Sequence, residues 1–247
     1  MSMDLSSPSL LRRPVIGRRR LLRGMGASVC VLAVGSLLPL RESSATGALT
    51  PARPALPPAA PPPIRFEVIR GGDVIGSHNV DFEGAGSEFS VSTRIDITVR
   101  VLGVPAFIFR HESTEHWADG RLQAFDSKTN DDGSDFFVTG RAEAGSFKII
   151  NRKGTEVAPA DIMVGSYWTP LIARQTQLID PQRGRVKSQQ LLSTDAMTIQ
   201  ARNGPVQATR YRVIGVTDGW VAYDGAGRWL AAELKKKGSD ILYRLPK

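Results

Sequence analysis

The chain has 247 residues, which allows one large domain or two small ones and leaves ample material for a core. Its net charge of +8 is concentrated at the start, because residues 1–45 hold seven arginines against Asp4 and Glu42, whereas the rest carries 25 basic and 22 acidic side chains. A remainder so close to balance excludes the electrostatic footprint of a nucleic-acid-binding protein.

The first 45 residues have the features of an export signal. Arg18 and Arg19, followed by Leu21 and Leu22, resemble the twin-arginine motif that precedes the apolar core of such signals. The apolar stretch 24–38 is shorter than the ~20 residues that span a bilayer, and small residues follow it. We therefore expect residues 1–45 to be a Tat-type signal peptide that the Tat export machinery recognises. The alternatives are a basic arm before a core helix and an uncleaved anchor.

Export would place the mature protein in the bacterial periplasm or outside the cell, with no transmembrane span. The only cysteine, Cys30, lies within the apolar stretch of the signal. Its removal would exclude disulfides, thiolate nucleophiles and cysteine-ligated metals together. Residues 46–63 are rich in proline, which fixes φ and removes hydrogen-bond donors. We expect an extended linker there, followed by a single antiparallel β domain over residues 64–247.

The stretch 88–101 is the clearest strand. Its odd positions from Phe89 to Val101 are apolar or β-branched, and its even positions are polar. Side chains of a strand alternate between two faces, so this pattern predicts one long strand with one buried face. At ~3.3 Å per residue it would reach roughly 45 Å, a length typical of strongly twisted sheets that curl toward a barrel.

Short turns at Gly71-Gly72, Asp119-Gly120 and Asp132-Gly133 join this strand's neighbours and predict an antiparallel meander. Residues 159–180, with apolar residues at nearly helical spacing, predict a short helical element. Further strands are expected at 186–193, 197–202, 206–216, 220–224, 228–237 and 240–245. The expected fold class is mainly β, a large curved antiparallel sheet or half-open β-barrel with one short helical insertion.

The strand at 106–117 points to a ligand cavity. Its inward face begins with Phe107 and Phe109, turns polar, and ends with Trp117. A buried face that turns polar in its middle either meets water in an open sheet or lines a cavity. Aromatic residues after position 160 could line the same space, although large aromatics usually fill cores. The candidates for lining this cavity are His111, Ser113, Glu115, Trp117, Tyr167 and Trp168.

Catalytic and metal sites are weaker interpretations of the same strand. His111 and His116 suggest zinc, but a spacing of five sends them to opposite faces of a strand. A catalytic group of His111, Ser113 and Glu115 would need direct hydrogen bonds between these side chains. Residues two positions apart on one face of a strand lie ~6.5–7 Å from each other, which is too far. We expect no catalytic residue, no metal site and no cofactor. Lysines 235–237 could face anionic lipid headgroups, although lysines on a terminal strand more often discourage edge pairing.

Short motifs in the chain resemble an uncharacterised family of exported, Tat-signal-bearing bacterial β-rich proteins, catalogued as a domain of unknown function. The motifs, mostly at turns, are Glu112–Asp119-Gly120, Ser166-Tyr167-Trp168-Thr169-Pro170, Gln177-Leu178, Gly184, Tyr211–Asp224, Gly227-Arg228 and Tyr243. The resemblance covers most of residues 64–245. It implies an antiparallel sheet similar to the half-closed barrels of periplasmic lipoprotein carriers, and it supplies no catalytic residue.

Three functions remain open at this point. The first is a non-enzymatic periplasmic module that binds or carries an apolar or lipid-like ligand on the concave face of its sheet. The second is an envelope structural or protein-interaction module with a filled core. The third is a hydrolase centred on His111. A cavity inside the sheet separates the first from the second, and bound metal together with a pocket at His111 would favour the third.

Overall fold

Sixteen strands and one short helix make up the part of the chain that the computed structural model describes, residues 61–236 and 238–246. The predicted signal, Cys30 and most of the predicted linker lie outside these residues. The strands of the first half are β1 Ile64–Arg70, β2 Asp73–Ala85, β3 Glu88–Val101, β4 Val104–Ala118, β5 Arg121–Asp131, β6 Ser134–Glu143, β7 Ser146–Asn151 and β8 Gly154–Pro159. Then follow β9 Met163–Val164, α1 Pro170–Ala173, β10 Gln177–Ile179, β11 Val186–Ser188, β12 Gln190–Ala201, β13 Gly204–Ile214, β14 Gly219–Tyr223, β15 Trp229–Lys236 and β16 Ser239–Arg244.

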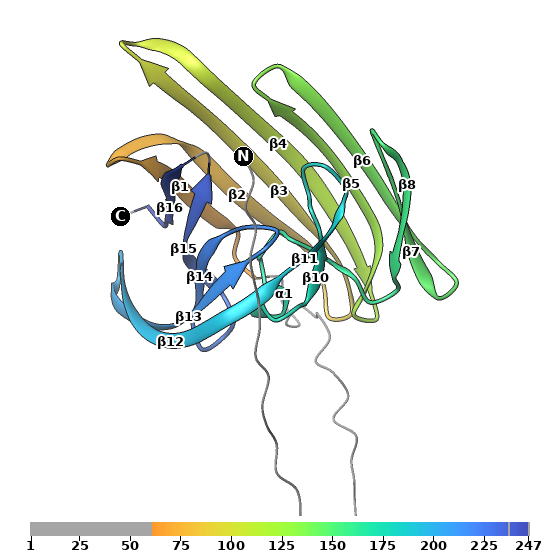
Figure 1. Ribbon diagram of the computed structural model, residues 1–247. Coiled ribbons are helices and arrows are strands. Elements are labelled where there is room, and N and C mark those ends of the chain that lie inside the picture. Colours follow the sequence, from red (N-terminus) through yellow and green to blue (C-terminus); the bar gives the residue numbers. More distant parts are fainter. Residues whose placement is uncertain (1–60, 237, 247) are drawn as a thin grey trace, which may run out of the picture. The chain divides into compact units, whose positions relative to one another are not determined.

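Thirteen of the strands form one antiparallel sheet in the order β12-β13-β14-β15-β16-β1-β2-β3-β4-β5-β6-β7-β8. Strands that lie side by side in this sheet also follow one another in sequence order, with one exception. That exception is the pair of β1 and β16, which joins the first strand to the last. The sheet curls strongly but its outer strands β12 and β8 do not pair, so the barrel stays open (Figure 1). The expected fold class, a curved antiparallel sheet or half-open barrel, is confirmed.

The long strand predicted at 88–101 is β3, with the same bounds. Phe89, Val91 and Thr93 are buried on its inner face, whereas Ser92 and Arg94 are exposed. The turns on either side follow the predicted chemistry, because Asp119-Gly120 and Asp132-Gly133 both have positive φ at both residues. Such turns match the twist of the strands that they connect.

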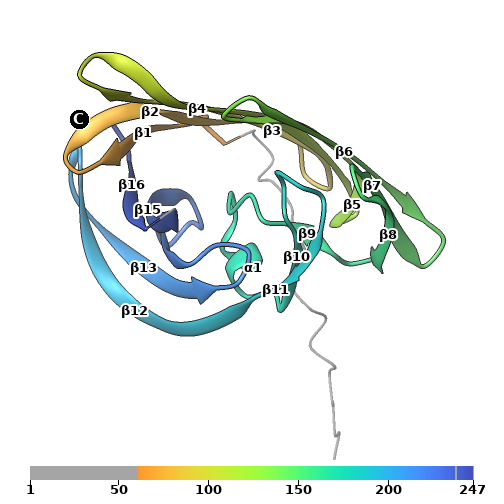
Figure 2. The same cartoon turned by 45° about the horizontal axis from the view of Figure 1, so that its top comes forward.

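A second, small layer closes part of the opening. Strands β9, β10 and β11 form a three-stranded sheet, and α1 lies beside it, within the curve of the large sheet (Figure 2). Thr169 begins α1, since its side chain accepts a hydrogen bond from the Leu171 N–H, and Pro170 occupies the first turn. Ile172, Leu178 and Ile179 from this layer are fully buried in the main core.

Two sequence expectations differ from the structure in extent. The helical element expected over 159–180 is helical only at Pro170–Ala173, because buried apolar residues on either side pair as β9 and β10. The strands expected at 186–193 and 197–202 are instead a short β11 and a continuous β12. No break occurs at residues 194–196, because the ladder of β12 with β13 holds them in extended conformation. Within the described residues, no helix has the length and apolar character needed to cross a bilayer.

Candidate functional site

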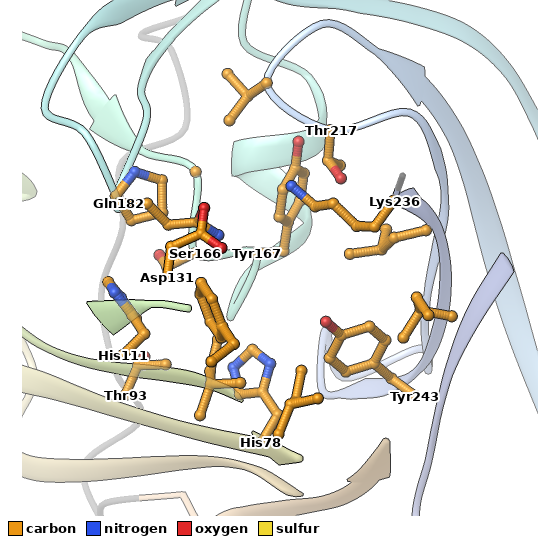
Figure 3. A pocket seen from close by; sticks show the side chains of 18 of the residues that line it. His78, Thr93, His111, Asp131, Ser166, Tyr167, Gln182, Thr217, Lys236 and Tyr243 are labelled. Atoms are coloured by element: carbon orange, nitrogen blue, oxygen red, sulfur yellow. The ribbon is translucent and has the colours of Figure 1, made fainter. Parts of the chain in front are cut away.

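A cavity of about 480 Å³ lies inside the curve of the sheet (Figure 3). Strands β2, β3 and β4 form one wall, and β15 and β16 form the facing wall. Residues 165–167, 180–183 and 216–217 from loops and the small layer complete the lining. Ligand pockets for small molecules typically measure ~300–1,000 Å³, so this space suits one molecule of that size.

The register of β2–β5 sets polar side chains in rows across the inner face of the sheet. The first row is His78, Ile95, His111 and Thr129, and the second is Val80, Thr93, Ser113 and Ser127. Beyond the first row, toward the β3–β4 turn, the cavity wall is apolar and consists of Ile97, Val99, Phe107 and Phe109. The two rows therefore form the floor of the cavity, which is largely polar, and the apolar residues toward the turn form its wall.

His78 lies in an aromatic enclosure at this floor. The rings of Trp229, Tyr243 and Phe66 meet it edge-on at centroid distances of 5.3, 5.5 and 6.2 Å. Both ring nitrogens are buried without a hydrogen-bond partner among the described residues. Burial, together with the neighbouring His111, lowers the pKa of His78 to about 3, so its imidazole is neutral at pH 7. A neutral imidazole offers one donor and one acceptor, and here both are unused.

His111 lies on the adjacent inner position of β4, and its Nδ1 is 2.8 Å from the Thr129 hydroxyl. Burial lowers the pKa of His111 to about 4, although Asp180 opposes this shift. No hydrogen bond joins His111 to Ser113 or Glu115 in the described part of the chain, so the catalytic group considered from the sequence is not assembled here. His116 lies on the other face, where its Nδ1 is 2.8 Å from the Ser90 hydroxyl. The predicted divergence of the two histidines is confirmed.

Two threonines add further unused polar groups to the lining. The hydroxyls of Thr93 on β3 and Thr217 in the β13–β14 loop are buried and lack partners among the described residues. Buried polar groups are satisfied in the great majority of cases, since each one left unpaired costs ~1–3 kcal/mol. Unpaired groups on two opposite walls of one cavity are what a site that hydrogen-bonds a ligand requires.

The rim of the cavity carries several charges. Lys187 Nζ is 2.7 Å from Asp180, and Arg183 is 3.0 Å from Asp131, so these cations are neutralised. Lys236 forms no ion pair with another described residue, and its ammonium extends into the opening toward Tyr167 (Figure 3). The cavity walls lower the pKa of Lys236 by removing hydration, but the residue as a whole is exposed at the rim. Arg70 also lines the cavity without an ion pair to a described residue, so Lys236 and Arg70 are the cations available to an incoming anionic group.

Glu115 lies one row below the polar floor and is fully buried. Its Oε2 accepts hydrogen bonds from the indole N–H groups of Trp117, at 3.0 Å, and Trp168, at 3.3 Å. Its other oxygen, Oε1, has no partner in the described structure. Burial raises the pKa of Glu115 to about 7, although the nearby Ser166 hydroxyl, whose hydrogen bond goes to the Val164 carbonyl, and the two indole donors oppose the shift. This carboxyl group is therefore part of the core and half-ionised near neutrality.

The cavity candidates from the sequence fall into two places. His111, Ser113 and Tyr167 line the cavity, whereas Glu115, Trp117 and Trp168 form the packed layer beneath it. Sequence reasoning missed most of the lining, including the polar residues His78, Thr93, Thr217 and Lys236. Thr93 could have been found, since it belongs to the inward-facing odd positions of 88–101. His78 could also have been found, because it alternates with Val80 and Phe82.

An open β-barrel-like protein with one interior cavity is the class that this fold and site define. The chain belongs to the family described as "Domain of unknown function (DUF6134)", whose model matches residues 66–246. This confirms the resemblance to an uncharacterised β-rich family. A crystal structure of a β-barrel-like protein of domain of unknown function DUF1849 from Brucella abortus is similar, with 13% identity and a TM-score of 0.55 over 76% of this chain and 96% of that one. A comparison with curated proteins gives no match.

Proposed function

We propose that this protein is an exported, non-enzymatic binding protein whose cavity holds one small amphipathic molecule. The observation that carries the proposal is the pairing of an apolar-walled cavity of about 480 Å³ with unsatisfied, uncharged polar groups at its floor. The twin-arginine motif at Arg18 and Arg19 supports export, and hence a site of action in the periplasm or beyond.

The floor selects the chemistry of the deeper end of the ligand. With pKa values of about 3 and 4, His78 and His111 are neutral at pH 7 and bring no charge to attract an ion. Their nitrogens and the Thr93 hydroxyl can donate to and accept from a hydroxyl, carbonyl or amide. The ligand that fits is therefore apolar along Ile97 and Phe107, with an uncharged polar group at the floor.

The rim favours an acidic group at the outer end of the ligand. Lys236 points into the opening and lacks an acidic partner at ion-pair distance among the described residues, although Asp180, Asp131 and Asp218 act on it from farther away. Lys187 and Arg183 are already paired. A carboxylate, sulfonate or phosphate at the mouth would supply that partner through a charge-assisted hydrogen bond. An acyl chain or fused-ring compound with an acidic head meets both requirements.

The cavity also bears on the two alternatives. A filled-core interaction module predicts a solid interior, and the space of about 480 Å³ favours the binding function over it. A hydrolase centred on His111 with Ser113 and Glu115 predicts hydrogen bonds among these three side chains, but the Nδ1 of His111 lies 2.8 Å from the Thr129 hydroxyl and neither of the other two bonds to it in the described part of the chain. These observations favour a binding role.

Filling the cavity should abolish binding of an apolar probe. We expect N-phenyl-1-naphthylamine, an uncharged fluorophore with one N–H donor, to bind the full chain saturably. Ile97→Trp places a large ring in the cavity and should weaken this binding at least tenfold, whereas Thr98→Trp adds the same ring to the opposite face of β3 and should not. Fluorescence titration measures both. Equal affinities for the two variants, or no saturable binding by the wild type, would contradict the proposal.

The charge at position 236 should act only on acidic ligands. 8-Anilinonaphthalene-1-sulfonate differs from the uncharged probe by its sulfonate group. Lys236→Gln should weaken sulfonate binding about tenfold, the usual size of a lost charged hydrogen bond, and leave the uncharged probe unaffected. Lys235→Gln is the matched control, because Lys235 is exposed and paired with Asp240 at 3.3 Å. An equal loss for both probes would show that Lys236 acts through packing instead of charge.

A further inference from the structure

The β3–β4 hairpin extends beyond the sheet to which it belongs. The ladder of β3 with β2 ends at Ile97, and that of β4 with β5 ends at Phe109. Past these points, residues 98–101 and 104–108 pair in ladders only with each other. In Figure 1 this two-stranded extension projects beyond the neighbouring hairpins at the upper edge. A free two-stranded projection contributes little to the core, which points to a role outside it.

The tip of this extension is apolar where its counterparts are acidic. Leu102-Gly103, Asp119-Gly120 and Asp132-Gly133 are three hairpin turns with positive φ at both residues. Asp and Asn tolerate this left-handed conformation, whereas leucine adopts it at a cost in strain. Leu102 is nevertheless 99% exposed, and Val101 and Val104 beside it are 58% and 65% exposed. Neither turn geometry nor packing accounts for leucine at this position.

The charges near the tip indicate which kind of surface it would contact. Within residues 100–110 the charged side chains are Arg100, which is in no ion pair with a described residue, and Arg110, which lies 3.9 Å from Asp96. The same edge of the sheet carries Arg70 and Lys236, where β1 and β15 end, together with Asp73 and Asp131, where β2 begins and β5 ends. Arg100 is therefore the charge nearest the tip. An apolar tip flanked by cations is complementary to a lipid surface with anionic headgroups, into which a leucine can insert while arginines remain at the headgroups.

We propose that residues Val101–Val104 dock the protein onto an anionic lipid bilayer, with Leu102 as the leading side chain. At the base of the extension, the Ile108 N–H donates to the Asp132 carboxylate and the Ile108 carbonyl accepts from the Asp132 N–H, and toward the tip the extension joins no further ladder among the described strands. Exposed backbone groups need water, which limits insertion to the tip. Val99 and Phe107 continue from the tip into the cavity wall, so docking brings the cavity mouth to the membrane surface. The docking proposal rests on the tip alone and does not require that the cavity binds a ligand.

Vesicle binding by the full chain tests the proposal. In sedimentation with vesicles of phosphatidylcholine and phosphatidylglycerol, Leu102→Asn should weaken binding about tenfold, because asparagine keeps the turn but loses the apolar contact. Asp119→Asn introduces the same residue at the β4–β5 turn, which has the same positive φ but lies at the opposite end of β4, and it should leave binding unchanged. Binding to vesicles of phosphatidylcholine alone should be at least tenfold weaker. Equal binding to both vesicle types would overturn the anionic requirement.

A local probe separates the tip from every other contact that the chain makes with vesicles. In a Cys30→Ser background, an environment-sensitive fluorophore attached through Leu102→Cys should shift to the blue with anionic vesicles, and one attached through Asp119→Cys, at the opposite end of β4, should not. Unchanged emission at position 102 while the protein sediments with vesicles would overturn the proposal. A lipid-independent dimer that Leu102→Asn disperses would also overturn it, since the tip would then contact a second copy. Uncharged-probe binding in the cavity should be the same in Leu102→Asn and wild type.

Discussion

Replacing Phe66 with alanine is expected to lower the free energy of unfolding by about 3–5 kcal/mol, the range for a large aromatic residue removed from a core. Phe66 is 2% exposed and lies on β1, where the first strand of the sheet meets the last. Its ring contacts Trp229 on β15 at a centroid distance of 4.8 Å and Tyr243 on β16 at 6.3 Å, both edge-on. With its contact to His78 on β2, at 6.2 Å, the ring of Phe66 joins four strands where β1 pairs with β16.

Urea unfolding measures this loss, with Phe66→Leu as the matched control. Leucine retains most of the apolar volume, so the control should lose much less than the alanine variant. The same truncation should move the pKa of His78 upward, because the missing ring lets water reach the buried imidazole. An NMR titration of the histidine signals follows that change. A loss below about 1 kcal/mol for alanine would mean that the pairing of β1 with β16 does not depend on this aromatic contact.

Whether a strand could be predicted from the sequence depends on how its side chains are buried. Residues 88–101 alternate strictly because one face of β3 meets the core, and a period of two cannot be mistaken for a helix. The failures lie where alternation is absent. Residues 194–196, between the two predicted strands, belong to β12, an outer strand with mostly exposed or half-buried side chains, so no burial pattern marked them as strand. Residues 163–164 and 177–179 are fully or mostly buried short runs, whose spacing suits a helix as well as a strand.

The site was only partly predictable because strand register assembles it. His111 and Ser113 could be found within one strand, since they interrupt its apolar face. His78 comes beside them only because Ile95 on β3 pairs with both His78 and His111, a relation that no local pattern contains. Lys236 lies in a run of lysines, a pattern typical of a protected edge, and its approach to the cavity depends on the curl of the whole sheet.

Replacing Glu115 with glutamine is expected to stabilise the protein at pH 8 but much less at pH 4.5. Burial raises the pKa of Glu115 from 4.5 to about 7 in the folded protein. Below pH 4.5 the carboxyl group is protonated in both the folded and unfolded states, so burial of charge costs nothing there. Above pH 7 it is ionised in both states and the full penalty applies, which amounts to about 3 kcal/mol for a shift of this size. Wild-type stability from this group therefore falls as the pH rises from about 4.5 to about 7.

Glutamine keeps an oxygen that can accept from the indoles of Trp117 and Trp168, and it carries no charge at any pH. The difference in unfolding free energy between Glu115→Gln and wild type should thus grow by about 3 kcal/mol in favour of glutamine between pH 4.5 and pH 8. His78 and His111 titrate in both proteins, so their opposite contribution, a loss of stability as the pH falls below about 6.5, cancels in the difference. Glu112→Gln alters an exposed carboxylate paired with Arg94 at 2.8 Å on the other face of β4, and should change stability by at most about 1 kcal/mol. A pH-independent difference for Glu115→Gln would show that the carboxyl group has the same pKa in the folded and unfolded states, and so that burial does not raise it.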